Sequence, residues 1–338
     1  MKIAFFVNDI ATEKPVFTTT RLAMEASNQG HEVWLIGACD FTYEANETVS
    51  ASGRSAPRRK YRSPETYLAA LRGEQGVTTH ISVDELDVLL LRNDPSMESG
   101  SRAWARSAGI IFGNVAMRSG VIVLNDPNGL AGALDKMFMQ FLPDSVRPRT
   151  LITRDRDEIK SFVQELGGKA VLKALRGIGT RSVFAVTPDN RSNLNQMIES
   201  ISRDGYIIDQ EFVAGAETGS TRLFVMNGEL LRHKGKTAAF RWVRTGDDMR
   251  ANIHISGTTE AVTPTDTHQH IAEAMRPWLV QEGMFLAGLQ IADDKLIDID
   301  VFSPGGLGVA QGFTKVNFAE AVIDSLVNKV QYIGYYRR

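Results

Sequence analysis

The stretch AGLQIADDKLIDIDVFSPGG at Ala287–Gly306 constrains the possible folds of this chain more than any other. Two short apolar runs, Ala287–Ala292 and Leu296–Val301, flank a polar turn at Asp293–Lys295. Apolar runs of this length on either side of a short polar turn predict a β-hairpin. The chain must therefore build a sheet that accommodates this hairpin.

The predicted hairpin carries an oxygen-rich face. Because side chains alternate along a strand, Asp298 and Asp300 point to the same side. A turn centred on Asp294 places Gln290 opposite Asp298, on that same face. Two carboxylates and an amide oxygen suit Mg²⁺ when phosphate oxygens complete its octahedron. The alternative interpretation is a solvated acidic face without a metal.

Composition narrows the classes of function. The 338 residues are enough for two or three domains, and the formal net charge of −2 gives no reason to expect a nucleic-acid or membrane partner. The single cysteine, Cys39, excludes an internal disulfide. The N-terminus, MKIAFFVNDI, lacks the features of a signal peptide, and no apolar run approaches the ~20 residues of a membrane span. We therefore expect a cytoplasmic protein.

The N-terminal third is expected to form an open α/β unit. A continuous apolar strand over Lys2–Val7 precedes helical spacing over Thr18–Gln29, a stop at Gly30 and a second strand over Glu32–Ile36. Strand, helix and strand in this order form one right-handed crossover unit. The first turn contains no GxGxxG, which disfavours a dinucleotide-binding fold.

Two more segments belong to this third of the chain. Residues 50–66, ASGRSAPRRKYRSPETY, are polar and basic, and we expect a surface excursion there. Asp87–Leu91 is expected to be a buried strand that ends at Arg92. Ligands bind at the carboxyl ends of parallel strands, so Arg92 is a candidate contact for an anionic substrate.

A second unit is expected to start near residue 121. A short strand over Val121–Leu124 leads to a predicted helix over residues 129–141, which contains Lys136. Pro143 and Pro148 then break the chain and indicate a linker.

A glycine-bearing loop follows in this second unit. The predicted strand Lys169–Leu175 contains Lys173 and leads directly into Arg176–Arg181, which holds two glycines. Such a loop can fold over a triphosphate, with its N–H groups on the phosphate oxygens and the lysine supplying charge. The other interpretation is that the two glycines only shape a turn.

Residues 232–257 are unusually basic. The basic side chains of this stretch are Arg232, His233, Lys234, Lys236, Arg241, Arg244 and Arg250. They would repel one another unless an anion lies among them. The alternative is a flexible, solvated loop, and we expect this stretch to be unstructured without a ligand.

Six segments occur in an order and spacing that can be compared with known families. They are LDVLLLRNDP at 86–95, VIVLNDPNGLAGALDKMF at 121–138, RTLITRD at 149–155, AVLKALRGIGTRSVFAV at 170–186, RANIHISGT at 250–258 and FLAGLQIADDKLIDIDVFSPGG at 285–306. Together they resemble bacterial glutathione synthetase, of the ATP-grasp superfamily. The resemblance runs from residue 1 to about residue 325.

The resemblance implies an α/β (α+β) ATP-grasp fold with an N-terminal open parallel-sheet domain. The expected parts are a substrate-binding domain at 1–124, a central lid domain at 125–203 and a C-terminal domain with a magnesium site at 204–338. It implies an ATP-dependent ligase that phosphorylates a carboxylate and lets an amine attack the acyl phosphate. The implied cofactors are ATP and Mg²⁺, the partners are a small-molecule acid and amine, and the assembly is a homo-oligomer.

The resemblance also implies roles in ATP binding. The lysines that match contacts to the ATP phosphates are Lys136 and Lys173. The glycine loop over the phosphates corresponds to Gly177, Gly179 and Thr180. The hinge that contacts adenine corresponds to Gln210, Glu211, Phe212 and Val213.

Further matches concern the acyl centre and the substrates. Basic and polar residues around the acyl centre correspond to Arg222, Arg250 and Asn252. The metal positions correspond to Gln290, Asp298 and Asp300. The turn that binds the end of the substrate corresponds to Ser303, Gly305 and Gly306.

Departures from the family pattern fall at nucleotide and substrate positions. Gln290 replaces a metal-binding Asp, whereas Asp300 replaces an Asn, so two carboxylates remain. Ser220 replaces the Asp that holds the ribose, for which Glu211 or Glu217 could substitute. The alternative function is therefore an ATP-binding homologue with a different substrate, or one without ligase activity that acts as a regulatory or scaffold protein. A ligase acting on an acidic peptide is a third hypothesis.

Overall fold

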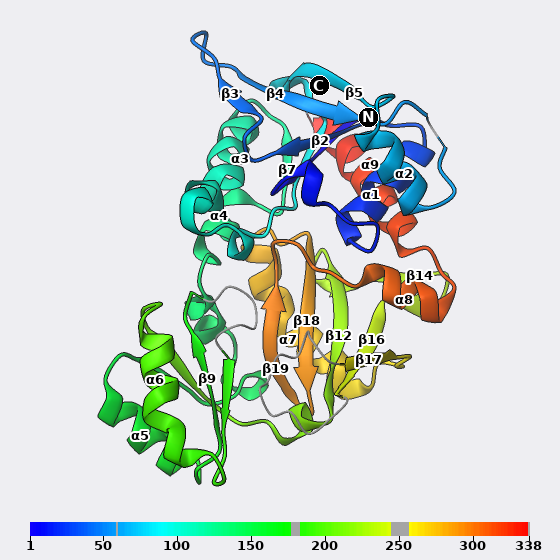
Figure 1. Cartoon of the computed structure of the whole chain (residues 1–338). Coiled ribbons are helices and arrows are strands. Elements are labelled where there is room, and N and C mark those ends of the chain that lie inside the picture. Colours follow the sequence, from blue (N-terminus) through cyan, green and yellow to red (C-terminus); the bar gives the residue numbers. More distant parts are fainter. Residues whose placement is uncertain (59, 177–182, 245–256, 337–338) are drawn as a thin grey trace.

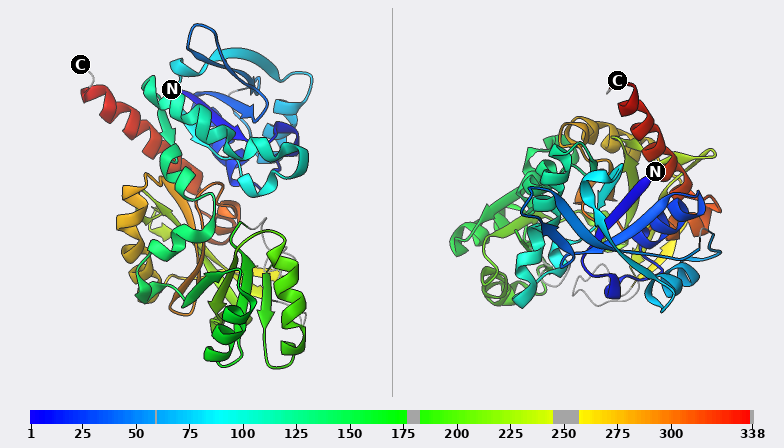
Figure 2. Two further views of the ribbon diagram at one scale, coloured as in Figure 1. Left: turned by 90° about the vertical axis from the view of Figure 1, so that its left-hand side faces the viewer. Right: turned by 90° about the horizontal axis from the view of Figure 1, so that it is seen from above.

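Three sheets stack along the long dimension of the molecule in the computed structural model (Figure 1). The structure describes residues 1–58, 60–176, 183–244 and 257–336. The N-terminal sheet lies at one end, the C-terminal sheet in the middle, and a smaller central-region sheet beside the latter at the other end, as the left view in Figure 2 shows. In this part of the chain no helix has the length and apolar character needed to cross a bilayer.

The N-terminal sheet has the strand order β3-β4-β2-β1-β6-β7, and β5 pairs with β4. Its strands are β1 (Lys2–Val7), β2 (Glu32–Gly37), β3 (Phe41–Tyr43), β4 (Val49–Ser55), β5 (Val77–Ser82), β6 (Val88–Leu91) and β7 (Ile122–Leu124). The β2-β1-β6-β7 part is parallel, which confirms the expected open parallel sheet. Its helices are α1 (Thr18–Asn28), α2 (Pro64–Arg72) and α3 (Ala108–Arg118).

Both faces of this parallel sheet are covered. Ile3 and Phe5 of β1 share a core with Leu22 of α1, whereas Ala4 and Phe6 pack in the core that includes Ala108 and Ala116 of α3. Burial on both sides explains why β1 is a continuous apolar run without polar alternation.

The surface excursion expected over 50–66 is wrong for its first part. Val49–Ser55 is strand β4, antiparallel to β2, β3 and β5. Ala51 is fully buried in the core, although neighbouring strand positions are polar. At the other end of the stretch, Ser63 caps α2, with its side chain and that of Thr66 bonding reciprocally to the backbone.

The C-terminal sheet is antiparallel, with the order β17-β16-β12-β18-β19 and with β13 paired to β12. Its strands are β12 (Gly219–Met226), β13 (Glu229–Leu230), β16 (Ala239–Arg244), β17 (Gly257–Glu260), β18 (Leu286–Ala292) and β19 (Lys295–Asp300). Leu223 and Leu289 lie in one core with Met275 of α7 (Asp266–Gln281), so α7 covers one face. The intervening residues Arg222 and Gln290 point to the other face.

Part of the basic stretch is structured, which corrects the expectation of an unstructured 232–257. Residues 232–244 form β14 (Arg232–His233), β15 (Lys236–Thr237) and β16. Oε2 of Glu320 lies 2.7 Å from Nζ of Lys234 and 3.1 Å from Nε2 of His233. Because the ammonium group of Lys234 pairs with an acid of the chain, it needs no bound anion. Residues 245–256 lie outside the described residues.

The central region contains an antiparallel sheet of order β10-β9-β11-β8. Its strands are β8 (Thr150–Thr153), β9 (Ala170–Ala174), β10 (Val183–Val186) and β11 (Ile207–Glu211). Helices α5 (Arg156–Glu165) and α6 (Leu194–Ser202) cover one face and enclose a separate core. On that face lies Asp209, which is fully buried opposite Leu172. Neither of its carboxylate oxygens has a hydrogen-bond partner among the described residues.

The segment between the first two sheets also differs from expectation. The helix expected over 129–141 ends early: α4 (Pro127–Gly132) is followed by a turn and a 3-10 helix at Lys136–Phe141. Asp135 starts the second piece by accepting from the N–H of Met137. Lys136 therefore lies at a helix start. The domain bounds 1–124, 125–203 and 204–338 stay a prediction, and β11 pairs with the central sheet although it lies beyond residue 203.

The last two helices return to the N-terminal end of the molecule. After β19 the chain forms α8 (Leu307–Thr314) and α9 (Phe318–Tyr336). Phe318, Val322 and Leu326 of α9 share a core with Leu22 of α1 and Phe224 of β12. Figures 1 and 2 show α9, in red, running beside the N-terminal sheet. One hydrophobic core therefore joins the N-terminal and C-terminal sheets.

Candidate active site

The predicted hairpin is confirmed as strands β18 and β19, and it forms the floor of the candidate site. Gln290 pairs with Asp298 in the register, as expected, and Gly288 pairs with Asp300. Because these residues lie on the face away from α7, the oxygen-rich face is turned toward the central region and the N-terminal unit.

Two lysines from different segments lie at Asp298. Nζ of Lys136 donates to both carboxylate oxygens of Asp298 at 2.8 Å. Nζ of Lys173, on β9, donates to Oε1 of Gln210 at 3.0 Å and to the carbonyl of Ile297 at 3.4 Å. The N–H of Lys136 bonds the carbonyl of Leu175, which follows β9, at 3.1 Å and ties the two lysine-bearing segments together.

The charges of this cluster shift its pKa values in opposite directions. Burial, with the charge of Lys136 beside it, lowers the pKa of Lys173 to about 8. Burial alone would raise the pKa of Asp298, but Lys136, Lys173 and hydrogen bonds from Lys136 and the Ile299 N–H lower it to about 2. At neutral pH Asp298 is therefore a carboxylate, and Lys173 is mostly an ammonium group that loses its proton readily.

Arg222 and Asp300 form the second ion pair of this face. Nη2 of Arg222 lies 3.3 Å from Oδ2 of Asp300, and its Nη1 donates to the carbonyl of Gly288 at 3.0 Å. The other carboxylate oxygen of Asp300 accepts the N–H of Ser303 at 3.1 Å. Asp300 thus connects Arg222 with the turn at 303–306.

Two of the positions that depart from the family pattern contact each other. Nε2 of Gln290 donates to the hydroxyl of Ser220, and both residues are buried. Because the amide nitrogen is engaged in this bond, the amide oxygen is the atom of Gln290 available to a cation.

Arg92 reaches the site from the N-terminal unit. Its guanidinium donates to Oγ1 of Thr19 at 3.3 Å and to the carbonyl of Pro304 at 3.4 Å. Burial lowers the pKa of Arg92 to about 10, although Asp300 and Glu13 act in the opposite direction. The arginine is 4 % exposed. Its two hydrogen bonds are long, and one of them holds its charge close to the turn at 303–306.

The glycines of this turn have distinct geometry. A Cβ on Gly305 would point into open space. Gly306 starts α8 with a φ of 95°. The ring of Phe240 lies where its Cβ would be, at 2.6 Å from the nearest ring atom, so a side chain there meets both strain and a clash.

The remaining predicted ATP contacts lie along and after β11. Gln210 is buried and bridges Lys173 and Thr150, with 3.2 Å from Nε2 to the threonine hydroxyl. Residues 211–213 lead from β11 into the 3-10 helix Ala214–Glu217. Lys169 lies 5.9 Å from the ring of Phe212 and 3.9 Å from a carboxylate oxygen of Glu217. The predicted residues outside the described part of the chain are Gly177, Gly179, Thr180, Arg250 and Asn252.

Asp94, two residues after Arg92 in the loop that follows β6, was not predicted as a site residue. Burial raises the pKa of the Asp94 carboxyl, and so does the charge of Asp300, whereas hydrogen bonds from Ser96 and the charge of Lys136 act in the opposite direction. The available signal was its position two residues beyond a candidate substrate contact at the end of a parallel strand.

The oxygen atoms of this face supply only part of the coordination that Mg²⁺ requires. The described residues contain no group of three or more His, Cys, Asp or Glu side chains able to hold a metal alone. Asp298, Asp300 and the amide oxygen of Gln290 instead provide an incomplete set of oxygen ligands on one face. Such a set fits an ion that also takes phosphate oxygens, and it does not fit a metal held by protein alone.

Two family sequence models match this chain. Residues 1–131 match the prokaryotic glutathione synthetase N-terminal domain, and residues 135–314 match the prokaryotic glutathione synthetase ATP-grasp domain. The glutathione synthetase of Synechococcus elongatus is 28% identical over 97% of this chain and 100% of its own length. That of Gloeobacter violaceus is 28% identical over 97% of both chains.

Solved structures share the fold. The ATP-grasp ligase PsnB complexed with a minimal precursor superposes with a TM-score of 0.61 at 17% identity, over 97% of this chain and 99% of the other. The D-cycloserine synthetase DcsG superposes with a TM-score of 0.61 at 12% identity, over 96% and 99%. The ATP-grasp fold expected from the sequence is thereby confirmed.

Proposed function

Because the chain belongs to the prokaryotic glutathione synthetase family, we propose that the face of β18 and β19 is where it activates a carboxylate with ATP and joins it to an amine. The chain is an ATP-dependent carboxylate–amine ligase with small-molecule substrates. The acyl phosphate forms first, and the amine then displaces phosphate to give the amide.

The observation that carries this proposal is the cluster at Asp298. Lys136 comes from the segment before the central sheet and Lys173 from strand β9 of that sheet. They meet near one carboxylate of the C-terminal sheet, with 2.8 Å from Lys136 Nζ to Asp298. Two convergent cations beside an acid are suited to a polyphosphate that shares a metal ion with that acid. We assign both lysines to the ATP phosphates.

Asp298, Asp300 and the amide oxygen of Gln290 would hold Mg²⁺. When bound, this ion would neutralise phosphate charge as it builds up during phosphoryl transfer. Arg222 lies next to Asp300 and would stabilise the negative oxygens of the acyl phosphate.

The substrates would enter between the C-terminal sheet and the N-terminal unit. Arg92 and the turn containing Ser303, Gly305 and Gly306 would bind the acid, since Arg92 already contacts the carbonyl of Pro304 in that turn. Adenine would lie against Gln210–Val213, with Glu211 or Glu217 on the ribose. Gly177, Gly179, Thr180, Arg250 and Asn252 keep the roles expected from the resemblance. The assembly is proposed to be a homo-oligomer.

The relatives suggest the substrate pair. Since the similar curated proteins are glutathione synthetases, we propose γ-glutamylcysteine and glycine as the acid and the amine. The test measures ADP release with Mg-ATP together with the tripeptide product by mass spectrometry, in parallel with a panel of other acids and amines. Coupled ADP and tripeptide support the pair, whereas ADP release only with another pair keeps the ligase and replaces the substrate.

A second candidate function rests on the bond between Ser220 and Gln290. This bond engages two positions that the family uses for ribose and metal, which would suit a protein that binds ATP without turnover. Asp298→Asn separates the two cases. Loss of turnover in this variant supports catalysis, whereas ATP binding without ADP release by the unmodified protein with every substrate pair supports the scaffold role.

A further inference from the structure

The loop after β6 is fixed by a network of charged and amide side chains. Oδ1 of Asn8 accepts the N–H of Asp94 at 2.7 Å, and Nδ2 of Asn8 donates to the carbonyl of Asp94 at 2.9 Å. The same Nδ2 donates to Oε1 of Glu98 at 2.8 Å. The side chain of Asn8 therefore pairs with both backbone groups of Asp94, as a neighbouring strand would.

Arginines hold the other side of this network. Glu98 is 2 % exposed and accepts Nε of Arg102 at 2.8 Å and Nη2 at 3.1 Å. Arg102 also donates to the carbonyl of Asn8 at 3.0 Å, and Arg106 donates to the carbonyl of Glu98 at 2.7 Å. Charge-assisted bonds of this kind are shorter and stronger than neutral ones. The backbone position of Asp94 is thus firmly set.

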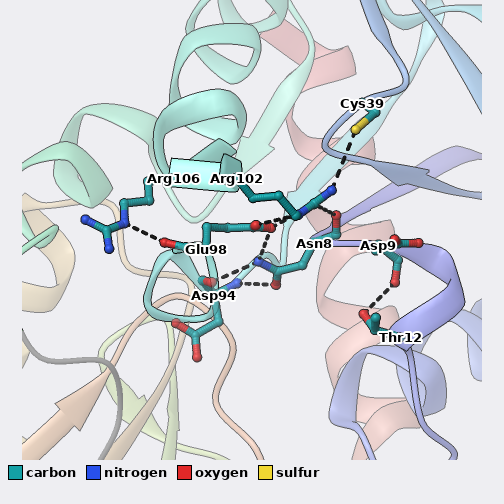
Figure 3. Close-up of polar contacts among 8 residues, drawn as sticks. All are labelled: Asn8, Asp9, Thr12, Cys39, Asp94, Glu98, Arg102 and Arg106. Atoms are coloured by element: carbon teal, nitrogen blue, oxygen red, sulfur yellow. Dashed lines mark hydrogen bonds and ion pairs between the residues drawn. The ribbon is translucent and has the colours of Figure 1, made fainter. Parts of the chain in front are cut away.

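The side chain of Asp94 takes no part in this network. Figure 3 shows its carboxylate pointing away from Asn8, Glu98 and Arg102, on the side of the C-terminal unit. One oxygen accepts the N–H of Ser96 at 2.9 Å, and the side chain of Ser96 also hydrogen-bonds to this carboxylate. Asp300 and Lys136 of the candidate site both act electrostatically on this carboxylate. A rigid loop thus presents to the site a carboxylate whose hydrogen bonds come from the neutral Ser96.

The other acids of the site are committed to cations. Asp298 is paired with Lys136 and Asp300 with Arg222, and both lie on the face assigned above to Mg²⁺. Asp94 has no ion pair in the described part of the chain. In the ligase reaction the amine substrate is protonated at neutral pH and must lose a proton before it can attack. None of the residues described above has been assigned to accept this proton.

We propose that Asp94 is a catalytic residue that binds the ammonium group of the amine substrate and accepts its proton. This inference rests on the ligase function proposed above. The carboxylate of Asp94 takes one proton from R–NH₃⁺. The nitrogen lone pair then attacks the acyl carbon, the C–N bond forms, and the C–O bond to phosphate breaks with its electron pair leaving on phosphate. The second proton leaves with phosphate, and Asp94 returns its proton to solvent.

Hydroxylamine separates this role from acyl-phosphate formation. It is largely unprotonated at neutral pH and needs no base, so it traps the acyl phosphate as a hydroxamate. We expect Asp94→Asn to lower amide formation by about 10²-fold or more and to leave hydroxamate formation nearly unchanged. The residual amide rate should rise about tenfold per pH unit with the free amine, whereas the unmodified enzyme should show a weaker dependence.

A matched control is Asp144→Asn, which changes an exposed aspartate that pairs with Arg147 outside the site. It should leave both products unchanged. Equal loss of amide and hydroxamate in Asp94→Asn, with folding intact by circular dichroism, would overturn the inference, and so would retention of both. If the unmodified protein forms no hydroxamate with any acid, the acyl-phosphate step itself fails, and the role of Asp94 fails with it.

Discussion

Replacing Asp209 by asparagine should remove a large pH dependence from the stability of the four-stranded central sheet. Asp209 is fully buried on β11, and burial alone raises the pKa of its carboxyl from 3.8 to about 7. The folded chain therefore holds a proton that the unfolded chain releases at lower pH. Stability from this group is complete below about pH 4 and is lost as the pH rises toward 7.

The size of the effect follows from the two pKa values. About three pH units separate them, and each unit corresponds to 1.36 kcal/mol, so the whole loss is about 4 kcal/mol. About two of these units lie above pH 5. Between pH 5 and pH 8, the opening free energy of the unmodified sheet should fall by about 3 kcal/mol relative to that of Asp209→Asn, which cannot ionise.

Hydrogen exchange measured by mass spectrometry gives the local opening free energy that this comparison needs. Peptides from residues 150–211 report on the central sheet, and peptides from β1 and β6 serve as an internal reference. Asp189→Asn is the matched control, since Asp189 is an exposed aspartate of the same region. A pH dependence that is the same in the unmodified protein and in Asp209→Asn would refute the reasoning.

Three further substitutions test other parts of the structure. Asn125→Ala should lower the free energy of unfolding, measured by urea titration, by about 3 kcal/mol or more. The substitution leaves three buried backbone groups without their partner, namely the N–H and carbonyl of Leu286 and the carbonyl of Val301. A change below about 1 kcal/mol would contradict this. Lys173→Met should weaken ATP binding, measured by calorimetry, at least about tenfold, and unchanged ATP affinity would refute the phosphate contact. The melting temperature should stay the same or rise, because burying an ammonium group is costly. Arg92→Ala should raise the KM of the acid about 10–100-fold while the KM of ATP stays constant, and a shift in the latter would argue against an acid contact.

The features that sequence alone could predict were those set by nearby residues. The β18–β19 hairpin depends on a polar turn and on alternation within one short segment, so its register, with Gln290 opposite Asp298, followed directly. The roles of Lys136 and Lys173 were predicted from the order and spacing of six segments along the chain. The ion pair between Lys136 and Asp298 confirms that this pattern brings remote segments together, although their role in ATP binding stays a prediction.

The features that sequence could not predict depend on partners far along the chain. Val49–Ser55 is a strand because β5 lies beside it, and its polar composition concealed that. From the sequence, Lys234 was expected to need a bound anion, but in the structure it pairs with Glu320 of α9. The backbone position of Asp94 is fixed by Asn8, which follows the neighbouring strand β1, and no local pattern reveals this contact.

The return of α9 to the N-terminal unit has a consequence for how the chain is made. Phe318, Val322 and Leu326 complete a core whose other side is built from Leu22 and from strand β1. A ribosome adds about 5–20 residues per second, so the N-terminal unit waits roughly 10–40 s for the helix that packs against its α1. During synthesis the apolar face of α1 is exposed to chaperones.

Truncation before α9 should therefore affect the far end of the molecule first. The exposed surface would be the apolar face of α1 in the N-terminal unit, although the deletion lies after the C-terminal sheet in the sequence. The core shared by the N-terminal and C-terminal sheets is thus completed only once α9 has been made, whereas the central-region sheet closes on a core of its own.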